Sequence, residues 1–215
     1  MSVKDFVQQR RDALIAMRRD FHMYPEPAWL EYRSAAKVAD RLISLGYDVA
    51  LGADVLDLDS RMGLPSDEVM KAAMDRAIEE GANLELVEKM GYGKTAIVAT
   101  MNFGGEGSVV AFRVDMDSND VIEAKEDNHV PTKKGFRSCH DKAMHACGHD
   151  AHMTMGLGLA EYLATHKDEF KGTIKLIFQP AEEGVRGAKA MAEAGVVDDV
   201  DLMFGMHIGF NEKLS

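Results

Sequence analysis

Apolar side chains recur at helical spacing near the start of the chain. Leu14, Met17 and Phe21 follow one another at intervals of three and four residues, and the pattern stops at Pro25. A second run with the same period ends at Gly46. This period places the apolar side chains on one helical face, and proline and glycine are common where helices end. The pattern predicts two amphipathic helices, the second followed by a short strand.

Residues 59–90 are charged and have no strand pattern. Their apolar residues keep helical spacing on both sides of Gly81, which is typical of a break between helices. We therefore expect two amphipathic helices here, forming a helical excursion outside the main sheet.

The remaining chain alternates between strand and helix patterns. Residues 94–101 and 108–117 are rich in β-branched and apolar residues and are separated by a glycine-rich turn, which predicts neighbouring antiparallel strands. A helix is expected at about 149–166, a strand at 172–179, a turn and helix after it, and a last strand near the end of the chain. This order favours an α/β domain, with a mixed β-sheet flanked by helices.

The composition is that of a globular protein, with 215 residues that are 46% hydrophobic and 28% charged. Two cysteines are too few for a disulfide scaffold, and no basic and apolar leader opens the chain, so a cytoplasmic location is expected. Apolar runs are too short to span a membrane. The formal net charge of -11 disfavours contact with phosphate backbones. We expect neither a membrane nor a nucleic acid as partner.

Polar residues with metal-ligand or acid–base capacity follow three predicted strands and begin one predicted helix: Asp115, Asp117, Glu182, Glu183, His207, Cys147 and His149. Each has an ordinary explanation when taken alone, such as a buried cysteine, a core histidine or a solvated pair of glutamates. Strand ends of α/β sheets are, however, where sites form. Thiolate, imidazole and carboxylate groups together suit zinc or manganese, and one glutamate of the pair could bind metal while the other moves protons. The set predicts metal-assisted hydrolysis.

Three other candidates are given no ligand role. Cys139 lies in a polar loop beside His140, and we assign it no function. His145 and His152 are expected to pack behind the site or to support its ligands.

Four motifs occur in a specific order: "AFRVDMD" at 111–117, "MHACGHDAH" at 144–152, "FQPAEEGVRGAKAMAEAGVV" at 178–197 and "MHIG" at 206–209. They resemble the amidohydrolase branch of the M20 metallopeptidase family, and the resemblance runs from the first helix to His207. The charged insertion at 59–90 is similar to members that hydrolyse p-aminobenzoyl-glutamate. The resemblance implies a zinc-peptidase-like catalytic domain that cleaves p-aminobenzoyl-glutamate to p-aminobenzoate and glutamate.

The resemblance also implies which residues act. Family members hold two divalent ions, Mn or Zn, and the positions that match their ligands are Cys147, His149, Glu183 and His207. Glu182 matches the general base, which moves a proton from the attacking water to the leaving amine. Asp117 matches a supporting carboxylate. A partner subunit or a homo-oligomer is expected beside the small N-acyl amino acid substrate.

Family members are longer than this chain. After the position of His207 they add a smaller lid or dimerisation domain and then supply one more histidine. We expect residues 1–215 to be the N-terminal part of the catalytic domain, to bind at most one ion tightly in isolation, to self-associate and to turn over negligible substrate. Two functions stay open: an amidohydrolase for p-aminobenzoyl-glutamate or another N-acyl amino acid, and a metal-binding remnant without activity.

Overall fold

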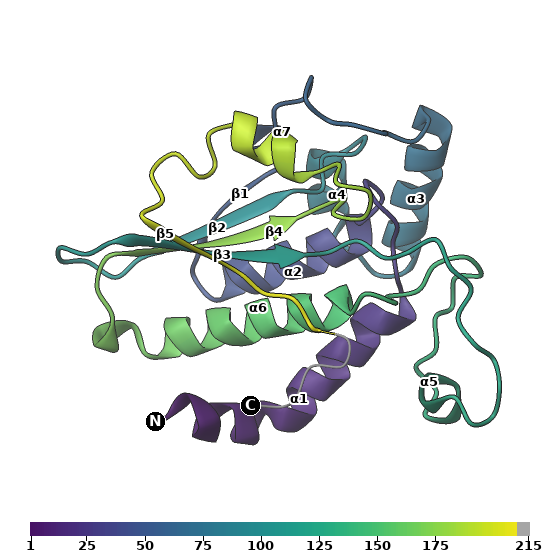
Figure 1. Cartoon of the computed structure of the whole chain (residues 1–215), viewed down its shortest axis with the longest axis horizontal. Coiled ribbons are helices and arrows are strands. Elements are labelled where there is room, and N and C mark those ends of the chain that lie inside the picture. The colour runs from purple at the N-terminus through teal and green to yellow at the C-terminus, as the bar shows by residue number, and fades with distance from the viewer. Residues whose placement is uncertain (210–215) are drawn as a thin grey trace.

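A mixed sheet lies at the centre of the computed structural model, which describes residues 1–209 (Figure 1). In these residues the sheet has five strands, in the order β1-β2-β4-β3-β5. β2 runs antiparallel to β1 and β4, whereas β3 runs parallel to β4 and β5. The strands are β1 Asp48–Leu51, β2 Ile97–Asn102, β3 Val109–Asp115, β4 Thr173–Gln179 and β5 Leu202–Gly205. The predicted α/β fold with a mixed sheet is confirmed.

The predicted pairing of β2 with β3 is wrong. The two strands run in opposite directions, but β4 lies between them: Phe178 pairs with Ile97 on one side and with Val114 on the other. β4 takes the central place because its second half is apolar and fully buried, whereas a short connecting loop alone does not determine pairing. The loop between β2 and β3 passes close to the start of β4, where a Cβ on Gly107 would lie 2.8 Å from the Gly172 Cα.

Helices cover both faces of the sheet (Figure 1). On one face, α1 (Val3–Met23), α2 (Tyr32–Ser44) and α6 (His149–Thr165) form the larger core with the strands. On the other face, α7 (Ala188–Glu193) and the 3-10 helix Gly52–Val55 pack over the sheet with Trp29. Within residues 1–209, no helix combines the length and the apolar character that a membrane span needs.

Residues 59–90 contain two helices, α3 (Asp67–Glu79) and α4 (Leu84–Met90), and no strand. The side chains of Ser66 and Asn83 cap their first turns. Both helices pack against α2, and four of their buried side chains extend the larger core: Ala73, Ala77, Val87 and Met90. Two further short helices complete the described chain, α5 (Val130–Lys133) and the 3-10 helix Lys167–Glu169.

Gly156 lets α6 pack closely on the sheet, and this contact gives a first testable prediction. A Cβ at Gly156 would lie 2.9 Å from Val114 Cγ2 and 3.0 Å from Phe178 Cζ, both in the buried core. Gly156→Ala is expected to lower the free energy of unfolding by about 1–3 kcal/mol, because overpacking outweighs the gain in helix propensity. Urea unfolding followed by circular dichroism measures this change.

Gly158→Ala is the matched control in the same helix. Its new methyl would meet only the Leu14 Cδ2 at 3.2 Å, and this half-buried side chain can move. We expect it to be neutral or slightly stabilising. Equal effects of the two substitutions would show that close packing at Gly156 is not important.

Candidate metal centre

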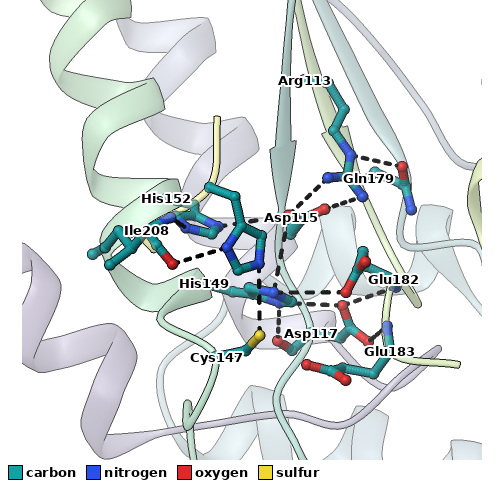
Figure 2. A network of polar contacts seen from close by, with 12 residues as sticks. Arg113, Asp115, Asp117, Cys147, His149, His152, Gln179, Glu182, Glu183 and Ile208 are labelled. Atoms are coloured by element: carbon teal, nitrogen blue, oxygen red, sulfur yellow. Dashed lines mark hydrogen bonds and ion pairs between the residues drawn. The ribbon is translucent and has the colours of Figure 1, made fainter. Parts of the chain in front are cut away.

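The candidate site lies where β3 and β4 end and α6 begins (Figure 2). β3 and β4 are parallel and in register, so that Asp115 pairs with Gln179 at their carboxyl ends. The residues that follow the two strands therefore emerge at the same edge of the sheet. Asp117 follows β3, and Glu182 and Glu183 follow β4.

The four predicted ligands come together at this edge. Cys147, His149 and Glu183 each offer one donor atom, and these atoms lie within 4.8 Å of one another. His207 follows β5, and its Nε2 lies 3.6 Å from the Cys147 Sγ. His149 is fully buried, Cys147 and Glu183 are half-buried, and His207 is exposed.

A second group of donors overlaps the first and includes residues that received no ligand role from the sequence. Donor atoms of Asp115, His149, His152 and His207 also lie within 4.8 Å of one another. His152 is three residues after His149 in α6, so both rings face the same side, and helical spacing could have identified it. Its Nε2 accepts a hydrogen bond from the Ile208 N–H at 2.9 Å, which leaves Nδ1 directed toward Asp115.

Asp117 positions three residues of the site through hydrogen bonds. Its main-chain oxygen accepts a hydrogen bond from His149 Nδ1 at 2.7 Å, so the other ring nitrogen of His149, Nε2, faces the donor groups. Its two carboxylate oxygens accept hydrogen bonds from the Glu182 and Glu183 N–H groups, both at 2.9 Å. This arrangement fits a supporting carboxylate.

The turn after β4 holds the two glutamates in an unusual backbone conformation. Ala181 and Val185 have positive φ angles of 50° and 58°, which is uncommon for residues other than glycine. The turn closes onto Gly187, whose N–H donates to the Ala181 carbonyl and where a Cβ would lie 1.8 Å from the Pro180 oxygen. Such backbone strain is typical of functional sites.

The site is rich in acidic groups, and this raises several pKa values. Burial and the nearby Glu183 raise the pKa of Cys147 to about 11. Burial and the charge of Asp117 raise the pKa of Glu31 to about 8. The Glu31 carboxyl group accepts a hydrogen bond from the Ala181 N–H, in the turn that carries Glu182 and Glu183. Burial disfavours the imidazolium of His149, but Asp117 and Asp115 outweigh burial and raise its pKa. A bound cation would relieve this concentration of negative charge.

The donor atoms fit a divalent metal. His149 Nε2 and Glu183 Oε1 are buried and have no hydrogen-bond partner among the described residues. Buried polar atoms are rarely left in this state unless a water molecule or an ion completes them. Sulfur, imidazole nitrogen and carboxylate oxygen together suit zinc and manganese. His149 belongs to both donor groups, so the two groups lie side by side.

A cavity of about 590 Å³ opens beside the ligands. Arg18, His22 and His145 line it together with Cys147 and His207. His145 is buried, and burial lowers its pKa to about 4, so its ring is neutral near pH 7. The cavity is large enough for a small organic molecule. A larger groove of about 690 Å³ between α1 and α6 is apolar and has no histidine, cysteine or carboxylate in its lining.

The fold and the donor atoms at the sheet edge fit a domain of the metallopeptidase type, and comparison with known proteins agrees. Residues 111–215 match the model of Peptidase family M20/M25/M40. The chain belongs to this peptidase family.

Two relatives are equally similar in sequence. The chain is 49% identical over 208 residues to a subunit of the p-aminobenzoyl-glutamate hydrolase of Escherichia coli (strain K12), a match that covers 97% of this chain and 48% of that protein. It is also 49% identical over 207 residues to indole-3-acetyl-aspartic acid hydrolase of Enterobacter agglomerans, covering 96% of this chain and 48% of that protein. The chain thus spans about half the length of the curated relatives it matches.

Solved structures share the fold. The crystal structure of the aminobenzoyl-glutamate utilization protein from Klebsiella pneumoniae superposes with a TM-score of 0.80 at 43% identity, covering 97% of this chain and 46% of that chain. The YXEP protein of Bacillus subtilis, described as a dinuclear metal binding peptidase from the M20 family, gives a TM-score of 0.66 at 29% identity, with coverage of 95% and 43%.

Proposed function

We propose that the chain carries the metal centre of an amidohydrolase that cleaves p-aminobenzoyl-glutamate to p-aminobenzoate and glutamate. The observation that carries the proposal is the meeting of Cys147, His149, Glu183 and His207 beside Glu182 at one edge of the sheet. The Escherichia coli and Klebsiella relatives, which are named for aminobenzoyl-glutamate, support this substrate.

A second substrate has equal support from sequence identity. The Enterobacter relative is named for indole-3-acetyl-aspartic acid. Both substrates are amides between an acid with an aromatic ring and an acidic amino acid, so the chemistry at the scissile bond is the same. The two proposals differ in the acyl group and in the acidic amino acid, which is glutamate in one and aspartate in the other.

The residues of this chain have distinct roles in the proposed reaction. Cys147, His149, Glu183 and His207, with Asp115 beside them, would hold the ions. Two divalent ions supply Lewis acidity, which activates water and polarises the amide carbonyl. Glu182 is partly exposed, and its Oε2 lies 3.8 Å from His149 Nε2, at the edge of the donor cluster. There it takes a proton from the attacking water as the C–O bond forms and gives it to the amine nitrogen as the C–N bond breaks.

Exposed apolar residues support a partner subunit or a homo-oligomer. β5 is an edge strand, and Leu202, Met203 and Phe204 are each about half exposed. Unpaired apolar edges tend to associate with another chain. The Escherichia coli relative is named as one subunit of its enzyme, which also supports a second chain beside it. A reducing compartment such as the cytoplasm suits the site, because Cys147 must remain a free thiol to bind metal.

Turnover measurements test the proposed function. The chain, loaded with Mn²⁺ or Zn²⁺, is expected to release p-aminobenzoate from p-aminobenzoyl-glutamate when a candidate partner subunit is added, and to release much less without it. Indole-3-acetyl-aspartate, assayed in parallel, identifies which of the two conjugates is preferred. Metal content is measured in the same samples. A chain that binds metal but hydrolyses neither amide with any partner would instead support the inactive metal-binding alternative.

A further inference from the structure

A second cluster of metal-ligating side chains lies apart from the metal centre and shares no residue with it. Glu80, Cys139 and His140 each offer one donor atom, and these atoms lie within 4.8 Å of one another. Glu80 is the C-cap of α3, whereas Cys139 and His140 lie in the loop between α5 and α6. The cluster therefore joins the helical segment at 59–90 to the loop that leads to the metal centre.

The surroundings of His140 are those of a metal ligand. Its Nδ1 lies 2.7 Å from the Pro25 carbonyl oxygen, so this nitrogen carries a proton and donates it. Its Nε2 lies 2.7 Å from Glu80 Oε1. A neutral ring would direct a lone pair at a carboxylate oxygen, which is repulsive; either a proton on Nε2 joins the two atoms, or both atoms bind a metal ion that lies beside them and replaces this direct contact. Metal-bound histidines commonly donate their other N–H to a carbonyl in this way.

Glu80 adds an independent observation that points to an ion. Its Oε2 is buried and has no hydrogen-bond partner within residues 1–209. The side chains of His140 and Glu80 are only 12% and 18% exposed, so water competes weakly for both groups. A buried carboxylate oxygen without a partner is costly unless an ion completes it.

The thiol of Cys139 completes the donor set. Its backbone N–H donates to the Met23 carbonyl at 2.9 Å, which fixes the loop against the end of α1. Burial and the carboxylate of Glu80 raise the pKa of Cys139, although Arg33 and Arg76 favour the thiolate. Cys139 is exposed at the surface, so an ion can reach the cluster from solvent.

Acidic groups offset part of the charge of the two neighbouring arginines, although the buried Nε and Nη2 of Arg76 have no hydrogen-bond partner within residues 1–209. Asp20 accepts two hydrogen bonds from the Arg33 guanidinium, at 2.9 and 3.1 Å, and this guanidinium stacks 3.8 Å over the Tyr24 ring. Arg76 interacts electrostatically with the buried Glu26. A thiolate and the Glu80 carboxylate would then bring two negative charges to the ion itself.

We propose that Glu80, Cys139 and His140 bind a single zinc ion that ties α3 to the loop before α6. Thiolate sulfur, imidazole nitrogen and carboxylate oxygen are each zinc ligands, and with three protein ligands a water molecule would take the fourth position. The ion is structural: it links segments that are distant in sequence and thereby stabilises the folded chain. This proposal is independent of the proposed amidohydrolase function.

Cobalt(II) absorption tests the second site, because thiolate-bound Co²⁺ has a charge-transfer band in the near ultraviolet. The chain has two cysteines, so Cys147→Ser removes the thiolate of the metal centre and leaves that of Cys139. We expect Cys147→Ser titrated with Co²⁺ to keep a thiolate band and the double variant Cys139→Ser/Cys147→Ser to lose it. A folded Cys147→Ser chain without any thiolate band would overturn the proposal.

Two further variants distinguish a site formed by all three ligands from binding by the Cys139 thiol alone. In the Cys147→Ser background, His140→Gln and Glu80→Gln keep Cys139 and are each expected to weaken Co²⁺ binding at least about tenfold. Zn²⁺ is expected to raise the melting temperature of Cys147→Ser more than that of the double variant lacking both cysteines, which keeps only the histidine and carboxylate ligands of the metal centre. If the band and the affinity are unchanged in both His140→Gln and Glu80→Gln, the ion is bound by the thiol alone and the proposal is wrong.

Discussion

Replacing Glu182 with glutamine is expected to lower turnover about 10²- to 10⁴-fold while metal binding stays nearly intact. Glutamine keeps the shape of the side chain but cannot take a proton from water. Glu182 is not in either donor group, whereas its neighbour Glu183 is. Steady-state kinetics of the active assembly, together with metal analysis of each variant, measure both effects.

Glu183→Gln is the matched control, because it makes the same chemical change one residue further along. Its Oε1 is buried without a partner among the described residues and faces the other donors, so we expect a clear loss of metal affinity as well as of rate. If Glu182→Gln loses the metal and Glu183→Gln keeps it, the assignment is wrong, because Glu182 would then be the metal ligand and Glu183 the base.

The sequence predicted elements well where the information is local. Helical spacing in α1 and α2 predicted their positions, because the period of apolar residues depends only on nearby positions. Strand partners depend on contacts between distant segments. Nothing local to residues 94–117 indicates that β4 enters between β2 and β3, and that pairing was predicted incorrectly.

The candidate site could also be predicted only in part from the sequence. The Cys147 and His149 pair and the Glu182 and Glu183 pair stand in short motifs, and the fold brings them together. His152 was given no ligand role, although it follows His149 by one helical turn. The roles of ligand and base within this set remain proposals.

The cluster of Glu80 with Cys139 and His140 could not have been predicted from sequence pattern. Glu80 ends a charged amphipathic helix, where a carboxylate is usually solvated, and Cys139 lies in a long polar loop. Only the packing of this loop against the ends of α1 and α3 brings the three side chains together. Such clusters follow from tertiary structure.

Asp117→Ala is expected to lower metal affinity about 10- to 100-fold and to destabilise the fold by about 2 kcal/mol or more. The substitution leaves the Glu182 and Glu183 N–H groups without their acceptors, so the turn that presents both carboxylates loosens. The His149 ring keeps its hydrogen bond, because Asp117 accepts it with a main-chain oxygen that alanine retains. Relief of the repulsion between Asp117 and Glu31 works in the opposite direction and limits the destabilisation.

Isothermal titration with Zn²⁺ or Mn²⁺ and urea unfolding measure the two effects of Asp117→Ala. Asp201→Ala is the matched control: its carboxylate accepts one backbone hydrogen bond, from the Val109 N–H at 2.8 Å, at the opposite end of β3. Because this group is exposed and remote from the donors, we expect it to change metal affinity by less than about twofold. Equal metal affinity in Asp117→Ala and the unmodified chain would mean that the hydrogen bonds beneath the glutamates do not position the ligands.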